Sequence, residues 1–306
     1  MRFALLILIL TYSLVSAQLC SSWGAGETLG YLDPQALSET SGIIRSQLDP
    51  NRLYSMSDSG SPYFYVSDLT GSNLQEVRVG TLGNRSRDIE DLAVGPCGSS
   101  RCLFIGNIGG NNVTRDSVEI ILVEERAEFP ERVEPVQVLT LLYPDGPHDA
   151  EGLAVHPNGD IYLLTKETPS LLGVPAPKLY RARPAPWRPP DEPVALELIA
   201  TLDLRSLSGS ALDVLSHMAT ALDISSDGSR VLVLTYNDVI ELELDLSTLT
   251  GPLRELGTDL PFHVVPVDRL IQQEALTYLP EQYGFIYTTE ARDGESPLVK
   301  HTCADF

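Results

Sequence analysis

Five copies of one strand motif, a turn after each copy and the spacing of the copies predict an all-β fold, a β-propeller of five blades. Each copy has a hydroxyl or acidic residue near its start and then runs into a short, largely apolar strand. The copies are Glu39–Ile44, Ile89–Val94, Ala150–Val155, Ala219–Ile224 and Gln273–Tyr278.

Each copy is followed by residues that favour a turn, and the turn leads into a second apolar run. The turns are Asp49–Asn51, Gly95–Gly98, Pro157–Asp160, Ser226–Gly228 and Pro280–Gln282. The second runs are Leu53–Met56, Leu103–Ile105, Ile161–Leu164, Val231–Leu234 and Phe285–Tyr287. Two apolar runs across a turn predict a β-hairpin, so we expect five hairpins and one blade around each.

The spacing of the copies agrees with blades of four strands. The equivalent positions Ser41, Glu90, Glu151, Thr220 and Glu274 are 49, 61, 69 and 54 residues apart. Blades of this kind take about 40–50 residues, and longer loops account for the excess. A sixth, degenerate blade in the proline-rich stretch between Glu167 and Leu215 is the lesser alternative. We interpret that stretch as outer strands plus an irregular loop.

The first 17 residues have the order of a secretory signal peptide. Arg2 precedes an apolar run, Phe3–Val15, and Val15 and Ala17 are small residues at the −3 and −1 positions of a cleavage site. The run is too short to span a membrane. We therefore expect cleavage after Ala17, a secreted, extracellular protein, and a single propeller domain over residues 18–306.

Four cysteines fit an oxidising compartment. Their positions favour the pairs Cys97–Cys102, close in sequence, and Cys20–Cys303, at opposite ends of the mature chain, although two other connectivities are possible. Residues 27–32 precede the first copy, so they can supply the outer strand of the last blade. The terminal disulfide would then lock the closed ring.

The charge of the chain bears on its partners. Forty-two acidic residues against 21 basic ones give a net charge of −21. Such a chain repels nucleic acid and anionic lipid and favours cations and basic partners. We expect a monomer with no nucleic-acid or membrane partner. Asn84 and Asn112 begin N-glycosylation sequons, which suits a secreted glycoprotein.

Symmetry places the head residues of the five copies in one ring at one end of the central channel. Three carboxylates gathered around an axis repel one another and are costly to bury unpaired. A bound cation would remove that cost, and a ring of oxygen ligands without Cys or His favours Ca²⁺ over zinc. The alternative is a water-filled, partly protonated polar channel. The expected ligands are Ser41, Glu90, Glu151, Thr220 and Glu274.

A second set of polar residues is expected on the same face, because the second strand of each hairpin returns to it. Asp58 and Lys166 end two such strands, and Asp149 immediately precedes a third copy of the motif. With a phosphate bound to the axial ion, Asp58 or Asp149 would be the general base and Lys166 the anion contact.

Several runs of the sequence resemble a family of secreted bacterial propellers of largely unassigned activity, related to phytase-like and esterase-like propellers. The runs are Asp88–Pro96, Phe104–Asn112, Tyr143–Leu153 and Thr165–Glu167. The resemblance covers nearly the whole mature chain, and Tyr143–Gly152 is its most specific part. It implies a secreted propeller without naming a substrate.

The ring also resembles that of the calcium-activated nucleotidases, the animal apyrases, which are five-bladed propellers with one axial Ca²⁺. Ser41, Glu90, Glu151 and Glu274 match that ring in kind, and Thr220 stands where those proteins have serine. The resemblance implies the blade count and the metal. It does not extend beyond these short motifs, so it implies less about nucleotide hydrolysis.

Two functions follow as hypotheses. The nucleophile-elbow, zincin, Walker and dinucleotide motifs are missing from the sequence. This favours a calcium-binding extracellular protein that binds a ligand or associates with a mineralised or other extracellular matrix. The alternative is a calcium-dependent hydrolase of nucleotides or other phosphate esters, for which a phosphorylated small molecule would be the ligand.

Overall fold

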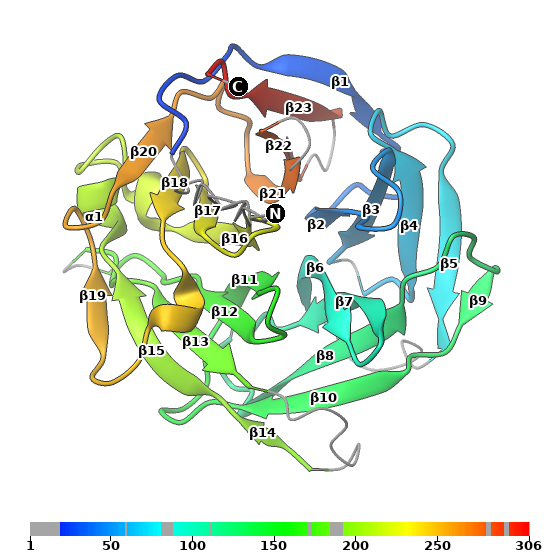
Figure 1. Cartoon of the computed structure of the whole chain (residues 1–306), viewed down its shortest axis with the longest axis horizontal. Coiled ribbons are helices and arrows are strands. Elements are labelled where there is room, and N and C mark those ends of the chain that lie inside the picture. The colour runs from blue at the N-terminus through cyan, green and yellow to red at the C-terminus, as the bar shows by residue number, and fades with distance from the viewer. Residues whose placement is uncertain are drawn as a thin grey trace, which may run out of the picture.

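A computed structural model of the chain shows five β-sheets arranged as a closed wheel around a central axis (Figure 1). It describes residues 19–305 except 59, 81–87, 111, 171–172, 184–191, 280–282 and 291–293. The predicted signal peptide and Asn84 lie outside the described residues, whereas Asn112 is exposed in a turn. No helix in the described ranges is long and apolar enough to cross a membrane.

Each blade has four antiparallel strands, ordered from the axis outwards, with short fifth strands described below. Blade 1 holds β2 (Thr40–Arg45), β3 (Arg52–Ser57), β4 (Tyr63–Asp68) and β5 (Gln75–Val79). Blade 2 holds β6 (Ile89–Cys97), β7 (Ser100–Asn107), β8 (Ser117–Glu124) and β10 (Gln137–Leu142). Blade 3 holds β11 (Ala150–Val155), β12 (Ile161–Thr165), β13 (Lys178–Ala182) and β15 (Glu197–Leu202).

Blade 4 holds β16 (Ala219–Ile224), β17 (Arg230–Thr235), β18 (Val239–Glu243) and β20 (Phe262–Val265). Blade 5 holds β21 (Gln273–Leu279), β22 (Gly284–Thr289), β23 (Ser296–Thr302) and β1 (Glu27–Leu32). All five predicted hairpins are therefore present as the inner half of a blade. The described part of 167–215 joins existing blades or forms the short helices α1 (Leu204–Leu207) and η2 (Val214–His217), so the five-bladed prediction is confirmed.

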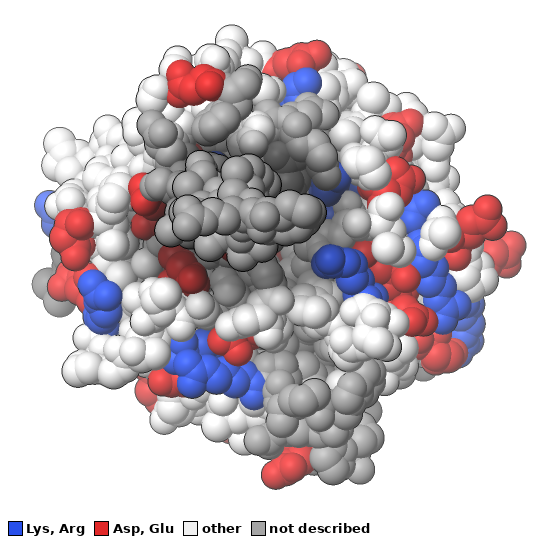
Figure 2. Space-filling model, viewed as in Figure 1, with Lys and Arg blue, Asp and Glu red and all other residues white. Residues whose placement is uncertain are grey.

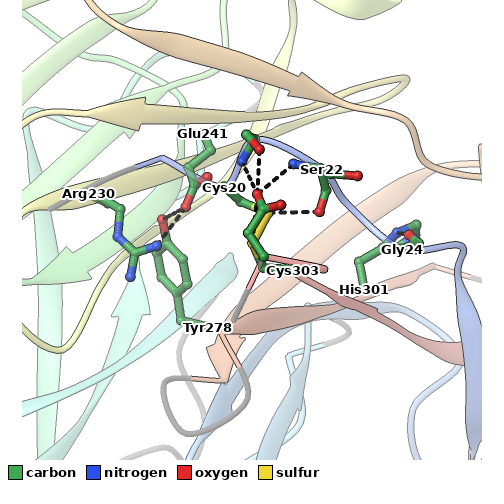
Figure 3. The surroundings of a disulfide bond; sticks show 10 residues. Cys20, Ser22, Gly24, Arg230, Glu241, Tyr278, His301 and Cys303 are labelled. Carbon is green, nitrogen blue, oxygen red and sulfur yellow. Dashed lines mark hydrogen bonds and ion pairs between the residues drawn. A yellow bond between two sulfur atoms is a disulfide. The ribbon is translucent and has the colours of Figure 1, made fainter.

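The ring closes through the N-terminal strand, as the sequence predicts. β1 pairs antiparallel with β23, and the Cys20–Cys303 disulfide joins the two ends just beyond that pairing. The carboxylate of Asp305 accepts hydrogen bonds from the backbone N–H groups of Ser21 (2.8 Å) and Ser22 (3.1 Å) (Figure 3). The Cys97–Cys102 pair is also formed and joins β6 to β7 beside their tight turn.

Three blades receive a short fifth strand from the next blade along the chain. β9 (Arg132–Val133), β14 (Val194–Ala195) and β19 (Arg254–Leu256) each lie in the connection between the third and fourth strands of one blade. They pair in parallel with the outer strand of the preceding blade, β5, β10 and β15 respectively. This exchange covers outer edges that would otherwise present unpaired backbone groups. Strands of two or three residues carry no readable alternation, so the sequence did not predict them.

The hydrophobic core is divided between the blades. The buried apolar residues of the described chain form five clusters, and each cluster lies between two neighbouring sheets. The inner strands are buried on both faces; every residue of β2, β11 and β16 is buried. On the face seen in Figure 2, acidic and basic side chains lie next to one another at several places on the rim.

The two disulfides should differ in their contribution to stability because they close loops of very different length. The cysteines are 283 residues apart in Cys20–Cys303 and 5 apart in Cys97–Cys102. On the chain-entropy estimate, we expect C20S/C303S to lower the free energy of unfolding by roughly 5 kcal/mol and C97S/C102S by roughly 2 kcal/mol. Urea titrations of both double variants measure the difference. Equal losses would contradict the role of the terminal pair in closing the ring.

Candidate functional site

A β-bulge recurs at the same place in all five inner hairpins. The register of each pair shifts between the residues on either side of one position. A bulge re-aims the side chain at the extra residue. The five positions are Ser41, Glu90, Glu151, Thr220 and Glu274. The backbone therefore shows that the residues predicted to form the ring are structurally equivalent.

The two hydroxyl residues of this set connect neighbouring blades. Ser41 Oγ donates to the carbonyl of Ile89 at 2.7 Å, and Thr220 Oγ1 donates to the carbonyl of Gln273 at 3.0 Å. Each acceptor is the residue just before the equivalent position of the next blade. Both hydroxyl protons are thus used, and only the oxygen lone pairs could face an ion.

Two of the three glutamates, Glu151 and Glu274, contact a lysine or a tyrosine that follows a second strand. Lys166 Nζ lies 2.5 Å from Glu151 Oε1 and 3.2 Å from the hydroxyl of Tyr236. The Tyr236 hydroxyl in turn donates to Glu274 Oε1 at 3.1 Å. All three glutamates are less than a tenth exposed. We call Glu90, Glu151, Glu274, Lys166 and Tyr236 the axial cluster.

The axial cluster holds more negative than positive charge, and the pKa values reflect this. Burial raises the pKa of Glu90 well above its usual range, and the neighbouring carboxylates of Glu151 and Asp88 raise it further. Burial and the charge of Glu151 raise the pKa of Glu274 to about 8. Burial would lower the pKa of Lys166, but Glu151 outweighs it and the ammonium pKa rises. Lys166 therefore remains charged and offsets one carboxylate.

The predicted catalytic pair of blade 3 is brought together. The backbone N–H of Lys166 donates to the carbonyl of Asp149 at 2.9 Å, and Asp149 Oδ1 accepts the N–H of Gly110 at 2.8 Å. Burial raises the pKa of Asp149, although the charge of Lys166 opposes the rise. Asp58 occupies the place of Lys166 in blade 1, where its N–H donates to the carbonyl of Glu39 at 3.0 Å.

A set of polar side chains fixes the loop that leads into β11. Asp145 Oδ2 accepts from Lys178 Nζ at 2.6 Å, and its Oδ1 accepts from the Tyr180 hydroxyl at 2.8 Å and lies 3.1 Å from His148 Nε2. Burial disfavours the carboxylate, yet these hydrogen bonds hold the pKa of Asp145 at about 2. The Tyr143–Gly152 run is thus a clamped loop that places Asp149 and Glu151.

Sequence reasoning placed Tyr236 among the polar strand ends of this face but gave it no role in the ring. It directly follows β17, just as Lys166 follows β12 and Asp58 follows β3. The sequence marked these strand ends as polar, but only the closed ring brings the Tyr236 hydroxyl between Lys166 and Glu274. The equivalence of the strand ends was the available signal for this residue.

The carboxylates of the axial cluster do not converge tightly. Within the described residues, the one group of three candidate ligands whose atoms all lie within 4.8 Å of one another is Cys20, Cys303 and Asp305. That group contains a disulfide, so its sulfurs are not available as thiolate ligands. An ion shared by Glu90, Glu151 and Glu274 would require their side chains to move closer together.

Comparisons with known proteins find a structural likeness but no sequence relative. No protein-family model and no curated protein sequence matches the chain. A solved structure, the PQQ-bound form of aldose sugar dehydrogenase from Streptomyces coelicolor, is similar over 92% of this chain and 98% of that chain. The sequence identity is 8% and the TM-score is 0.49.

The axial cluster should make stability depend on pH in the absence of divalent cations. The carboxyl pKa of Glu274 rises from 4.5 to about 8 on folding, so between these values the folded chain holds a proton that the unfolded chain has released. Raising the pH from 5 to 8 therefore favours unfolding. We expect the melting temperature to fall over this range in EDTA.

The variant Glu274→Gln should flatten this pH dependence because the amide does not titrate. The exposed Glu255 provides a matched control, since Glu255→Gln removes the same charge from the outer strand β19. Calorimetric melting at pH 5, 6, 7 and 8 measures both. If E274Q and E255Q changed the pH dependence of the melting temperature equally, that dependence would not come from the axial cluster.

Proposed function

We propose that the axial cluster binds a cation, Ca²⁺, and that the chain is a secreted, acidic, calcium-binding propeller with an extracellular binding role. The observation that carries the proposal is the excess of buried carboxylates over ammonium groups in the cluster. Buried like charges either take up protons or bind a cation. A divalent ion neutralises Glu90 and Glu274 together, whereas protonation neutralises them one at a time.

The donor set supports calcium as the ion. Carboxylate and hydroxyl oxygens are its usual ligands, and its coordination shell of 6–8 oxygens adapts to loosely placed groups. Glu90, Glu151 and Glu274 would hold the ion, with the lone pairs of Ser41 and Thr220 as further donors. In this proposal the ammonium of Lys166, 2.5 Å from Glu151, competes with the ion for that carboxylate.

The partner is proposed from charge and compartment. The signal-peptide pattern and the two disulfides suit an extracellular location. A net charge of −21 favours basic partners and surfaces rich in calcium, such as a mineralised matrix. The bound ion would contribute an attachment point for a phosphorylated or carboxylated ligand on this face.

The second candidate is a calcium-dependent phosphate-ester hydrolase, and the pairing of Lys166 with Asp149 favours it. The raised pKa of Asp149 suits a general base better than an ordinary aspartate. A bound divalent cation can polarise a phosphoryl oxygen. In this function Lys166 would contact the substrate anion, and Asp149 would accept the proton of the attacking water. Asp58, from blade 1, would be the other candidate base.

Lys166→Met tests the first proposal, because a purely structural role of Lys166 does not predict tighter Ca²⁺ binding when the ammonium is removed. Removing the competing ammonium should tighten Ca²⁺ binding, whereas E274Q should weaken it by about tenfold or more because a ligand charge is lost. Isothermal titration calorimetry at pH 7 in two buffers measures affinity and proton release together. We expect proton release on binding to the original protein, and less in E274Q, where Glu90 remains as a ligand with a raised pKa. The control E255Q should bind like the original.

Two results would contradict the calcium proposal. One is the lack of binding at millimolar Ca²⁺ in folded original protein. The other is weaker rather than tighter binding in K166M. Phosphate release from nucleotides and simple esters, with Ca²⁺ or with EDTA, then decides between the two functions. If the protein is a hydrolase, K166M loses turnover while it gains Ca²⁺ affinity. If it is a binding protein, neither the original protein nor K166M shows turnover.

A further inference from the structure

A cavity of about 640 Å³ opens at the end of the channel opposite the axial cluster. Each inner strand begins at the ring residue and ends at this cavity, so every blade contributes to its lining. Representative lining residues from blades 1 to 5 are Arg45, Val94, Val155, Asp223 and Thr277. The volume lies in the range of small-molecule sites.

Asp91 lies at a level between the cavity and the axial cluster. It follows Glu90 in β6, and its Oδ2 accepts the backbone N–H of Leu153 in β11 at 2.8 Å and lies 3.4 Å from that of Leu222 in β16. One side chain thus reaches from blade 2 to blades 3 and 4 across the axis. It is 1% exposed. The cavity is therefore a site distinct from the axial cluster.

The polar groups deep in the cavity are fixed by backbone hydrogen bonds. Asp223 accepts the N–H of Tyr278 at 2.8 Å and that of Ile224 at 2.8 Å. The hydroxyl of Thr277 accepts the N–H of Arg45 at 3.1 Å. These bonds satisfy backbone N–H groups at the axial edges of the inner strands. They also hold the side chains in place before any ligand enters.

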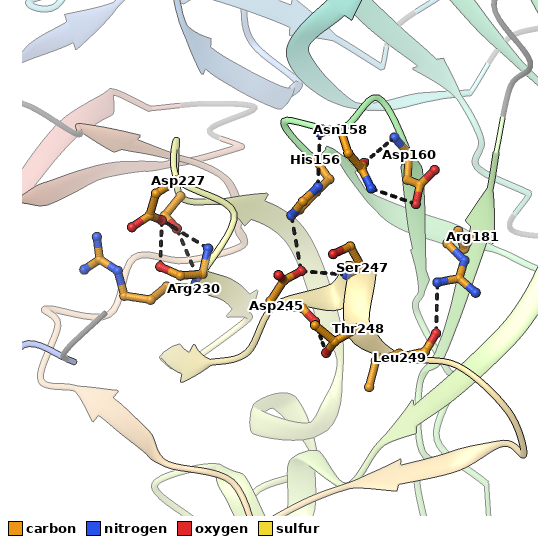
Figure 4. A network of polar contacts seen from close by, with 12 residues as sticks. His156, Asn158, Asp160, Arg181, Asp227, Arg230, Asp245, Ser247, Thr248 and Leu249 are labelled. Atoms are coloured by element: carbon orange, nitrogen blue, oxygen red, sulfur yellow. Dashed lines mark hydrogen bonds and ion pairs between the residues drawn. The ribbon is translucent and has the colours of Figure 1, made fainter. Parts of the chain in front are cut away.

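Side-chain contacts also order the turns that carry the lining residues Pro157 and Ser225, next to the cavity (Figure 4). Asp227 Oδ1 accepts from Ser225 Oγ at 2.6 Å and from the N–H of Ser229 at 3.1 Å. His156 Nε2 lies 3.3 Å from Asp245 Oδ1, which joins the turn of blade 3 to the segment after β18. The opening is thus largely preformed, which lowers the entropy lost on binding.

The lining differs in charge from the rest of this acidic chain. Among its described members, Arg45 and Arg101 are basic and Asp223 is the one acid. Burial raises the pKa of Asp223 to about 6, so it is partly neutral in mildly acidic solution. Arg101 Nη1 donates to Gln47 Oε1 at the rim. Apolar side chains, among them Ile44, Leu48 and Val155, form the walls.

We propose that this cavity binds a small organic anion with an apolar body, such as an aromatic or aliphatic carboxylate or sulfonate. The anionic group would contact the guanidinium of Arg101 at the rim, and the body would pack against Ile44, Leu48 and Val155. The lining has two arginines against one aspartate, so its net charge favours an anion, and its volume suits a small molecule. The site is independent of the axial cluster.

A fluorescent amphipathic anion, 8-anilinonaphthalene-1-sulfonate, is the probe that tests the proposal. We expect one saturable site on the folded protein. Arg101→Gln should weaken binding by about tenfold or more, because a charge-assisted contact is removed. Arg254→Gln, which removes an exposed arginine from β19 in blade 3, is the matched control and should bind like the original.

Blocking the opening provides a second variant that leaves Arg45 and the buried lining untouched. Ser226 lines the cavity and is exposed, so Ser226→Trp should fill the opening and abolish the saturable signal. Thr258→Trp, at an exposed turn before β20, should leave it unchanged. Unchanged binding in S226W would overturn the location. The proposed recognition of the anionic group by Arg101 would be overturned if R101Q bound the anion as tightly as the original protein does. A neutral dye should bind equally well to both proteins.

Discussion

The unpaired inner edges of five strands are the constraint on which the rest of this structure depends. A ring of sheets leaves the innermost strand of each blade without a partner on its axial side, and buried backbone groups without partners are costly. Side chains from neighbouring inner strands satisfy these edges. Ser41 and Thr220 donate to carbonyls near the ring, and Asp91, Asp223 and Thr277 accept N–H groups deeper in the channel.

This solution places polar and acidic residues inside the molecule and thereby creates its chemistry. The inner strands carry polar side chains at defined levels, and the bulge near each strand start turns one of them towards the axis. Where the residue is serine or threonine, it bonds to the next blade. Where it is glutamate, it has no proton to donate when ionised, so the buried carboxylates either take up protons or meet a positive charge. Lys166 supplies one positive charge. The carboxylates that it does not offset are the basis for the proposed cation site.

The two ends of the channel therefore differ for one reason. At the ring end three of the inner strands carry glutamates, and Lys166 and Tyr236 lie among them. At the other end they finish in apolar residues and turns, and the arginines Arg45 and Arg101 join the lining. Asp91 spans three blades at an intermediate level, so the charge at one end is separated from the ligand space at the other. The two ends of one channel thus have linings of opposite character.

The sequence alone determined the inner hairpins and the equivalence of the five ring positions, and it favoured the five-blade count, the closing strand 27–32 and both disulfide pairs over their alternatives. These follow from repeated local patterns, because alternation, turn residues and cysteine positions are properties of short segments. The strand exchange by β9, β14 and β19, the role of Tyr236, the clamp on Asp145 and the cavity were decided by the tertiary structure. Each depends on residues far apart in the chain that meet only when the ring closes, and no local pattern encodes which blade a side chain will face.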